Sequence, residues 1–151
     1  MSAPTSWHQQ YSINLAAEIR VFLKGKPCRV YATPYDVRLT YSTGSGDAQI
    51  QTVVRPDSWV VCDLSKIDTR GCLGAPNWII EILSPGNVDH DTKTKFDLYE
   101  EKGVNECWIA IPGLKTIQTF VLAEADRYQI AAEYTAPGPM PVATLPGLAV
   151  E

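Results

Sequence analysis

Two acidic residues interrupt short apolar stretches of the sequence. Asp57 lies at the start of "DSWVVCD", and Glu81 lies inside "NWIIEILSP". An ionised carboxylate among apolar side chains needs a cation or hydrogen-bond donors beside it. Two carboxylates that meet in one place are also ligands that a hard divalent cation accepts. Asp57 and Glu81 are therefore candidates for a metal site.

Each acid also has a simpler explanation. Asp57 follows Pro56, so it could be a turn residue. Glu81 could lie at an exposed edge of a sheet. Strand alternation places Trp78, Ile80 and Ile82 on one face and Ile79, Glu81 and Leu83 on the other. Glu81 then shares its face with apolar neighbours, which favours a carboxylate that is held by a partner.

A lysine that could serve these acids lies on a predicted helix over residues 88–102, which ends at Gly103. At about 100° per residue, one broad face of this helix carries Val88, Thr92, Lys95, Phe96, Leu98 and Tyr99. The other face carries Lys93, Asp97, Glu100 and Glu101.

Lys95 thus lies on the inward face, where a lysine is seldom buried without a partner. One explanation is an ion pair with Asp91, one turn earlier, with the lysine stem along apolar surface. Taken alone, that pair is the better explanation. With Asp57 and Glu81 also in view, we expect Lys95 to point at the two acids, and Lys93 to point outward.

The remaining candidates are weaker. Glu18 projects near the edge of the apolar face of the first helix, although exposure to solvent is the more common fate of such a residue. The acids Asp89 and Asp91 are explained by a helix start. His8 and His90 are isolated in the sequence, and we assign neither a catalytic role.

The elements that must position these residues form an α/β fold. Apolar residues at helical spacing predict a first helix over about 7–24. The nearly continuous apolar runs "WVVC" and "WIIEIL" predict strands that are covered on both faces. Segments 116–122 and 128–134 predict an antiparallel hairpin, 64–76 a loop, and the Pro/Gly-rich tail 136–151 a surface wrap. We expect one domain over 1–151, with a central mixed β-sheet flanked by helices and additional antiparallel strands.

The composition of the sequence limits the binding partners, the location and the cysteine chemistry that we expect. A net charge of −4 over 151 residues argues against nonspecific coating of nucleic acid. No apolar run is long enough for a membrane span, and the N-terminus lacks a signal-peptide pattern, so we expect a cytoplasmic protein. Cys28, Cys62, Cys72 and Cys107 show no paired spacing, and we expect buried free thiols rather than disulfides or a zinc site.

Three stretches together resemble a known family. "VVRPDSWVVCD", "GAPNWIIEILSP" and "DTKTKFDLYEEKGVNECWIAIP" are similar, in order and spacing, to the Uma family of restriction-endonuclease-like proteins, formerly a domain of unknown function. This family belongs to the PD-(D/E)XK nuclease superfamily, so the resemblance implies a restriction-endonuclease-like core. The superfamily lysine two residues after the second acid is absent here, where Leu83 stands.

The resemblance implies roles for particular residues. Asp57 and Glu81 take the places of the two motif acids, and Lys95 matches a lysine supplied by the following helix. Asp91, Tyr99 and Glu106 also match family positions. Asp57, Glu81 and the Ile82 carbonyl would bind Mg²⁺ or Mn²⁺, DNA would be the substrate, and a homodimer without an organic cofactor is expected.

The sequence also departs from the family pattern. Asn77 and Ile111 stand where acids are usual, and Cys107 replaces a tyrosine. None of these lies among the three catalytic candidates. Two other functions stay open: a non-cleaving protein of the same fold that binds nucleic acid or protein, and a phosphodiesterase that acts on a small nucleotide.

Overall fold

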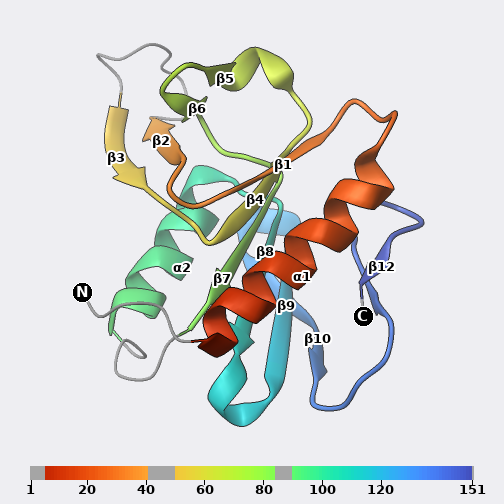
Figure 1. Cartoon of the computed structure of the whole chain (residues 1–151). Helices are drawn as coiled ribbons and strands as arrows, with labels where there is room; N and C mark the ends of the chain where they lie inside the picture. Colours follow the sequence, from red (N-terminus) through yellow and green to blue (C-terminus); the bar gives the residue numbers. More distant parts are fainter. Residues whose placement is uncertain (1–5, 41–49, 84–89, 151) are drawn as a thin grey trace.

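The computed structural model describes residues 6–40, 50–83 and 90–150. Its two α-helices are α1 (Ser6–Leu23) and α2 (His90–Lys102), both close to the predicted spans. They lie on opposite sides of a central sheet (Figure 1). The predicted start of the second helix at 88–89 lies outside the described residues. Each helix is followed by a glycine with positive φ, which is the usual way that a helix ends.

The central sheet has six strands and mixed direction. Its order is β1 (Arg29–Ala32), β4 (Ser58–Val61), β7 (Trp78–Ile82), β8 (Glu106–Ile111), β9 (Thr116–Leu122) and β10 (Tyr128–Tyr134). Among its neighbouring strands, only β7 and β8 run parallel, and α2 connects them in the sequence. The hairpin β9–β10 is antiparallel, as predicted. The α/β fold with a mixed sheet between helices is confirmed.

A smaller four-stranded sheet has the order β3 (Ile50–Val54), β2 (Asp36–Thr40), β6 (Gly71–Leu73) and β5 (Ile67–Asp68). The prediction of a plain loop over 64–76 is therefore wrong, because β5, β6 and a 3₁₀ turn (Leu64–Lys66) lie there. Strands of two and three residues are too short to show alternation. Gly71 allows the close strand contact: a Cβ there would lie 2.1 Å from the Asp36 carbonyl oxygen.

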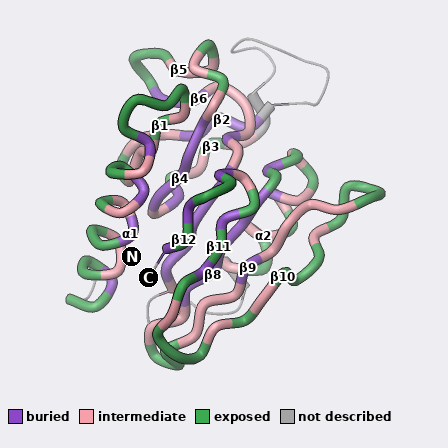
Figure 2. Tube along the Cα trace, turned by 90° about the vertical axis from the view of Figure 1, so that its right-hand side faces the viewer, coloured by how far each residue is buried: buried purple, intermediate pink, exposed green. Residues whose placement is uncertain are grey.

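The central sheet separates two apolar cores. One lies against α1 and contains Trp78, Ile80 and Ile82 of β7; the other lies against α2 and the small sheet and contains Ile79. The predicted alternation of β7 is thus confirmed. Strands β4 and β7 are buried along their whole length, as their continuous apolar character predicts. Figure 2 shows the buried residues gathered in the strands, with much of α1 exposed.

The prediction that the C-terminal segment 136–151 wraps the surface is incomplete. The segment does not only wrap the surface, because it contributes apolar side chains to the core beneath α1: Met140, Val142, Leu145, Leu148 and Val150. Its ends pair as β11 (Met140–Pro141) and β12 (Ala149–Val150). Two further 3₁₀ turns cover Pro112–Leu114 and Glu124–Asp126. Apolar residues spaced between prolines and glycines thus complete one core.

The cysteines divide into two kinds. Cys28 and Cys62 form a disulfide, so the expectation of free thiols is wrong for this pair. The register Arg29↔Val61 places the two residues opposite each other, just beyond the paired ends of β1 and β4. Cys72 and Cys107 are free and buried, as expected. No helix in the described part of the chain is long and apolar enough to cross a membrane.

Candidate active site

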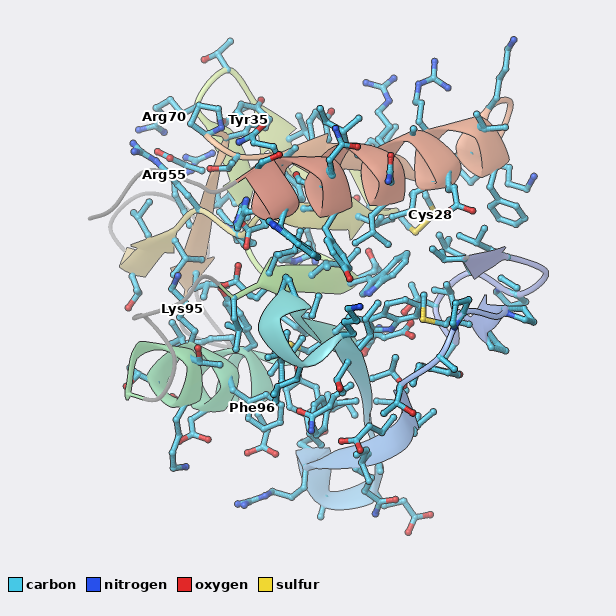
Figure 3. All side chains as sticks on the ribbon, turned by 60° about the horizontal axis from the view of Figure 1, so that its bottom comes forward. Cys28, Tyr35, Arg55, Arg70, Lys95 and Phe96 are labelled. Carbon is cyan, nitrogen blue, oxygen red and sulfur yellow. A yellow bond between two sulfur atoms is a disulfide. The ribbon has the colours of Figure 1, made fainter. Side chains whose placement is uncertain are left out.

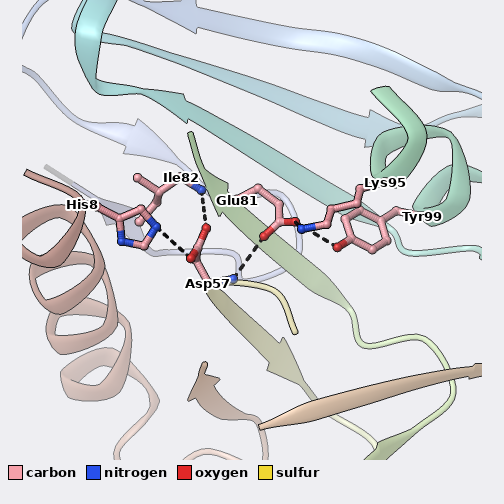
Figure 4. Close-up of polar contacts among 6 residues, drawn as sticks. All are labelled: His8, Asp57, Glu81, Ile82, Lys95 and Tyr99. Carbon is pink, nitrogen blue, oxygen red and sulfur yellow. Dashed lines mark hydrogen bonds and ion pairs between the residues drawn. The ribbon is translucent and has the colours of Figure 1, made fainter. Parts of the chain in front are cut away.

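The register of two central strands brings the acids together. Strand β4 is antiparallel to β7, with Ser58 opposite Ile80. Asp57 immediately precedes β4, so it lies beside the end of β7, where Glu81 is found. The Asp57 backbone N–H donates a hydrogen bond to Glu81 Oε1 over 3.1 Å (Figure 4). Two acids 24 residues apart are thus joined through one hydrogen bond.

The Asp57 carboxylate is held at both oxygens. Oδ2 accepts a hydrogen bond from the Ile82 backbone N–H at 2.7 Å. Oδ1 lies 2.9 Å from His8 Nε2, on the first turn of α1. The Asp57 side chain keeps 17% of its surface exposed, so solvent or a ligand can still approach it.

Glu81 is the more deeply buried acid, with 7% of its surface exposed. Its Oε2 accepts a hydrogen bond from the Tyr99 hydroxyl at 3.1 Å and lies 3.5 Å from Lys95 Nζ. Burial, opposed by the Lys95 charge and aided by the Asp57 charge, raises the pKa of Glu81 from 4.5 to about 7. Hydrogen bonds from the Asp57 N–H and Tyr99 act in the lowering direction.

Helix α2 delivers Lys95 and Tyr99 one turn apart on the same face. Beside them, the Phe96 ring packs against Phe120 and Tyr128, with centroids 4.7 and 4.9 Å away, which fixes the helix on the sheet. Burial and then the Glu81 charge raise the pKa of the Tyr99 phenol, so it stays a proton donor. Lys95 is 34% exposed: it contacts Glu81 and still reaches solvent.

The structure thus brings together Asp57, Glu81, Ile82, Lys95 and Tyr99. The Lys95 contact with Glu81 agrees with the helical projection, and Lys93 points outward to pair with Asp97. One residue of the outer face, Glu100, differs from the projection: its side chain is 15% exposed and accepts a hydrogen bond from the Tyr128 N–H.

The structure does not place the two auxiliary candidates Glu18 and Asp91 in this cluster. Glu18 follows His8 by ten residues on α1, which is about 15 Å along the helix axis. That separation carries Glu18 away from Asp57, so the structure does not bring it to the site. The side chain of Asp91 lies outside the described residues. Of the departures from the family pattern, Asn77 lies off the site, where its Oδ1 accepts a hydrogen bond from the Cys62 N–H. Cys107 is buried in the same apolar core as Tyr99.

His8 is the residue that sequence reasoning missed. It is 8% exposed and contacts Asp57 directly. The sequence did hold a signal. The buried positions of α1 are His8, Leu15, Ile19 and Leu23, so His8 continues the spacing of the apolar stripe toward the N-terminus. A polar residue on that stripe needs a polar partner in the core, and Asp57 is that partner.

The fold and this cluster place the protein in the restriction-endonuclease-like class. A solved structure with the same fold is described as "a putative nuclease belonging to DUF820 from Anabaena variabilis ATCC 29413". The likeness has a TM-score of 0.69 at 16% identity and covers 95% of this chain and 75% of the other. Residues 1–151 match the Uma2 family, described as "Putative restriction endonuclease", and the chain belongs to that family. No curated protein matches the sequence.

Proposed function

We propose that this protein is a metal-dependent nuclease that hydrolyses phosphodiester bonds in DNA. In this proposal Asp57 and Glu81 bind the metal, and Lys95 supplies from α2 the lysine that the strand lacks. One observation carries the proposal: the Lys95 and Tyr99 side chains of α2 and the backbone N–H of Asp57, just before β4, converge on a single buried carboxylate of β7, Glu81. A carboxylate that is surrounded by titratable groups and contacted by a partly exposed lysine is typical of a catalytic site.

The residues present fit Mg²⁺ or Mn²⁺. No group of three or more His, Cys, Asp or Glu among the described residues is arranged to hold a metal. Mg²⁺, however, is commonly bound by one or two carboxylates together with waters and substrate phosphates. The raised pKa of Glu81, to which the neighbouring Asp57 charge contributes, indicates a place that gains from added positive charge. When bound, such a metal polarises a phosphate and lowers the pKa of water.

A third oxygen ligand is the Ile82 carbonyl. The Ile82 N–H points to the Asp57 carboxylate. The N–H and C=O of one strand residue face the same side of the strand. The Ile82 carbonyl therefore faces the side on which Asp57 lies, in keeping with the role that the family resemblance implies.

Lys95 and Tyr99 have different tasks in this proposal. The Tyr99 hydroxyl holds Glu81 Oε2 in place from inside the core. The Lys95 ammonium lies at the solvent side of the same oxygen, where it can orient a water or stabilise charge that develops on the phosphate. The two residues thus fix Glu81 from one helix while only Lys95 can reach a substrate.

We also propose a homodimer, because two copies would present one site to each strand of a duplex. Three large apolar side chains are exposed on α1 and support a surface for contact: Trp7 at 59%, Ile13 at 61% and Val21 at 75%. Sedimentation of the wild type and of Val21→Glu would test it. A monomeric wild type would exclude the dimer.

The decisive experiment is plasmid nicking in Mg²⁺ or Mn²⁺. The wild type is compared with Asp57→Asn, Lys95→Ala and the matched control Lys93→Ala. Lys93 lies on the same helix but is 77% exposed and pairs with Asp97, so its loss should leave cleavage unchanged. Nicking that requires metal and is lost in the first two variants supports the proposal.

Other outcomes point elsewhere. Equal nicking by all four proteins would indicate a contaminant or a different site. If no protein nicks but the wild type binds DNA, the fold serves binding rather than cleavage. If short dinucleotides are hydrolysed and plasmid is not, the substrate is a small nucleotide.

A further inference from the structure

The positive charge of this acidic protein is unevenly distributed. Four of its 13 basic residues fall between positions 20 and 29: Arg20, Lys24, Lys26 and Arg29. No acid occurs between Glu18 and Asp36. Because the whole chain carries a net charge of −4, this segment is a local reversal of sign. Such a reversal attracts anions that the rest of the surface repels.

The four cations surround a real concavity. A pocket of about 360 Å³ opens where α1 ends and β1 begins, and all four line it. Each of the four is exposed. Cys28 also lines the pocket, and its disulfide with Cys62 ties this corner to the end of β4. Figure 3 shows Cys28 near the end of α1 that lies away from Lys95.

A purely structural role does not explain all four cations. Basic residues near a helix C-terminus compensate the helix dipole, and Lys26 does so directly: its Nζ donates to the Phe22 carbonyl at 3.0 Å. That effect falls off within the last helical turn. Arg29 lies on β1, six residues beyond the end of α1, yet it lines the same pocket.

We infer that this pocket, which we call the basic pocket (Arg20, Lys24, Lys26 and Arg29), binds the phosphodiester backbone of the nucleic acid at a distance from the cleaved bond. The inference rests on the proposed nuclease function. Arginine and lysine bind phosphate oxygens through charge-assisted hydrogen bonds. Lys24 follows His8 by 16 residues, which is about 24 Å of helix. One DNA strand rises about 3.4 Å per nucleotide, so a strand that runs along α1 would meet the pocket about seven nucleotides from the site.

The test measures binding of a fluorescein-labelled 30-base-pair duplex by anisotropy, in EDTA to prevent metal-dependent cleavage and over a range of KCl concentrations. The variant is Lys24→Glu with Arg29→Glu. The matched control is Lys93→Glu with Arg127→Glu, which makes the same charge change at two side chains that are 77% and 76% exposed. Arg127 precedes β10, at the opposite edge of the sheet from β1. Circular dichroism confirms that both variants are folded.

The basic-pocket variant should bind at least about tenfold more weakly at 0.1 M salt. The slope of log affinity against log salt should fall by about two, because each lost phosphate contact removes about 0.9. The control variant should keep the wild-type slope. Equal affinity and slope for both variants would overturn the inference, as would a variant that loses only inorganic phosphate, measured by calorimetry, and binds the duplex normally.

Failure of this inference can be told apart from failure of the nuclease proposal. A wild type that nicks plasmid in Mn²⁺, together with a basic-pocket variant that binds and nicks equally well, leaves the nuclease and overturns the backbone contact. A wild type that never nicks, but whose duplex binding depends on Lys24 and Arg29, keeps the phosphate contact and rejects cleavage.

Discussion

Glu81 and Glu106 are buried glutamates on the adjacent parallel strands β7 and β8, with 7% and 1% of their surfaces exposed. Their partners differ in kind. Glu106 accepts hydrogen bonds from the Trp108 indole N–H at 2.8 Å and from the backbone N–H groups of Ala143 and Thr144 at 3.2 and 2.8 Å. Glu81 is approached by Lys95, Tyr99 and the Asp57 N–H.

Under the proposed function, this difference separates a structural carboxylate from a reactive one. The donors to Glu106 are neutral and fixed, and two of them belong to the C-terminal segment, so this acid fastens that segment to the sheet. Glu81 is surrounded by groups that carry or exchange protons, and Lys95 connects it to solvent. Burial alone therefore does not set these two acids apart; the chemistry of their partners does.

The largest difference between substitutions of Glu81 and Glu106 is expected in the rate of plasmid nicking. Glu81→Gln keeps the size of the side chain but removes the charge that binds metal, and should lower the nicking rate by roughly 10²–10³-fold, as does the loss of one key electrostatic group in other enzymes. The nicking rate of Glu106→Gln should stay within about threefold of the wild-type rate when it is assayed below the unfolding temperature of the variant. A Glu106→Gln protein that is folded by circular dichroism but inactive would contradict the assignment of roles.

The order should reverse for stability, so that substitution of Glu106 lowers the free energy of unfolding more than substitution of Glu81 does. Glu106→Ala removes the acceptor of the buried Trp108 indole N–H and of two partly buried backbone N–H groups, and a buried donor that is left without a partner costs about 1–3 kcal/mol. We expect the free energy of unfolding in urea to fall by about 3 kcal/mol. Glu81→Gln in the absence of metal should be no less stable than wild type at pH 8, since it removes a buried negative charge. A larger loss for Glu81→Gln would make Glu81 the structural residue.

The contribution of Glu81 should be visible in how the stability of the wild type, relative to Glu81→Gln, changes with pH. Its folded pKa of about 7 exceeds the ordinary value of 4.5, so the folded state binds more protons than the unfolded state between these values. Stability contributed by the protonated form is therefore present below about pH 4.5 and lost as pH rises through 7. We expect the metal-free wild type, relative to Glu81→Gln, to lose roughly 1–3 kcal/mol over this interval. Saturating Mn²⁺ should reduce that loss, and urea unfolding at several pH values measures it.

Sequence patterns predicted the parts of the site that regular elements carry. The period of a strand placed Glu81 beside Ile79 and Leu83, and the period of a helix placed Lys95 and Tyr99 on one face. Each prediction needed one element only. The fold-level prediction succeeded for the same reason, because the continuous apolar runs of β4 and β7 indicate burial without reference to any other segment.

Apart from the strands β5 and β6, which are too short to show alternation, the failed predictions have a different cause, which is pairing between distant segments. The partner of Asp57 is His8, and no local pattern links positions 49 residues apart. Disulfide formation depends on the β1–β4 register, which sets Cys28 opposite Cys62. The burial of Leu145 and Leu148 depends on the anchor that Glu106 provides to the segment before them. Such pairings become visible only when the sheet order is known.

The smallest expected effect concerns His8, which touches the proposed metal ligand without belonging to the predicted catalytic set. His8→Ala removes the group that lies against Asp57 Oδ1, and loss of such an outer contact typically weakens metal binding by about 10–100-fold. We expect about a tenfold weaker affinity for Mn²⁺ by calorimetry, with cleavage that recovers at high metal concentration. His8→Gln, which keeps a hydrogen-bond donor, should bind Mn²⁺ more tightly than His8→Ala. If neither substitution changes Mn²⁺ affinity while both lower the unfolding free energy, His8 belongs with Glu106 as a structural residue and not with Glu81.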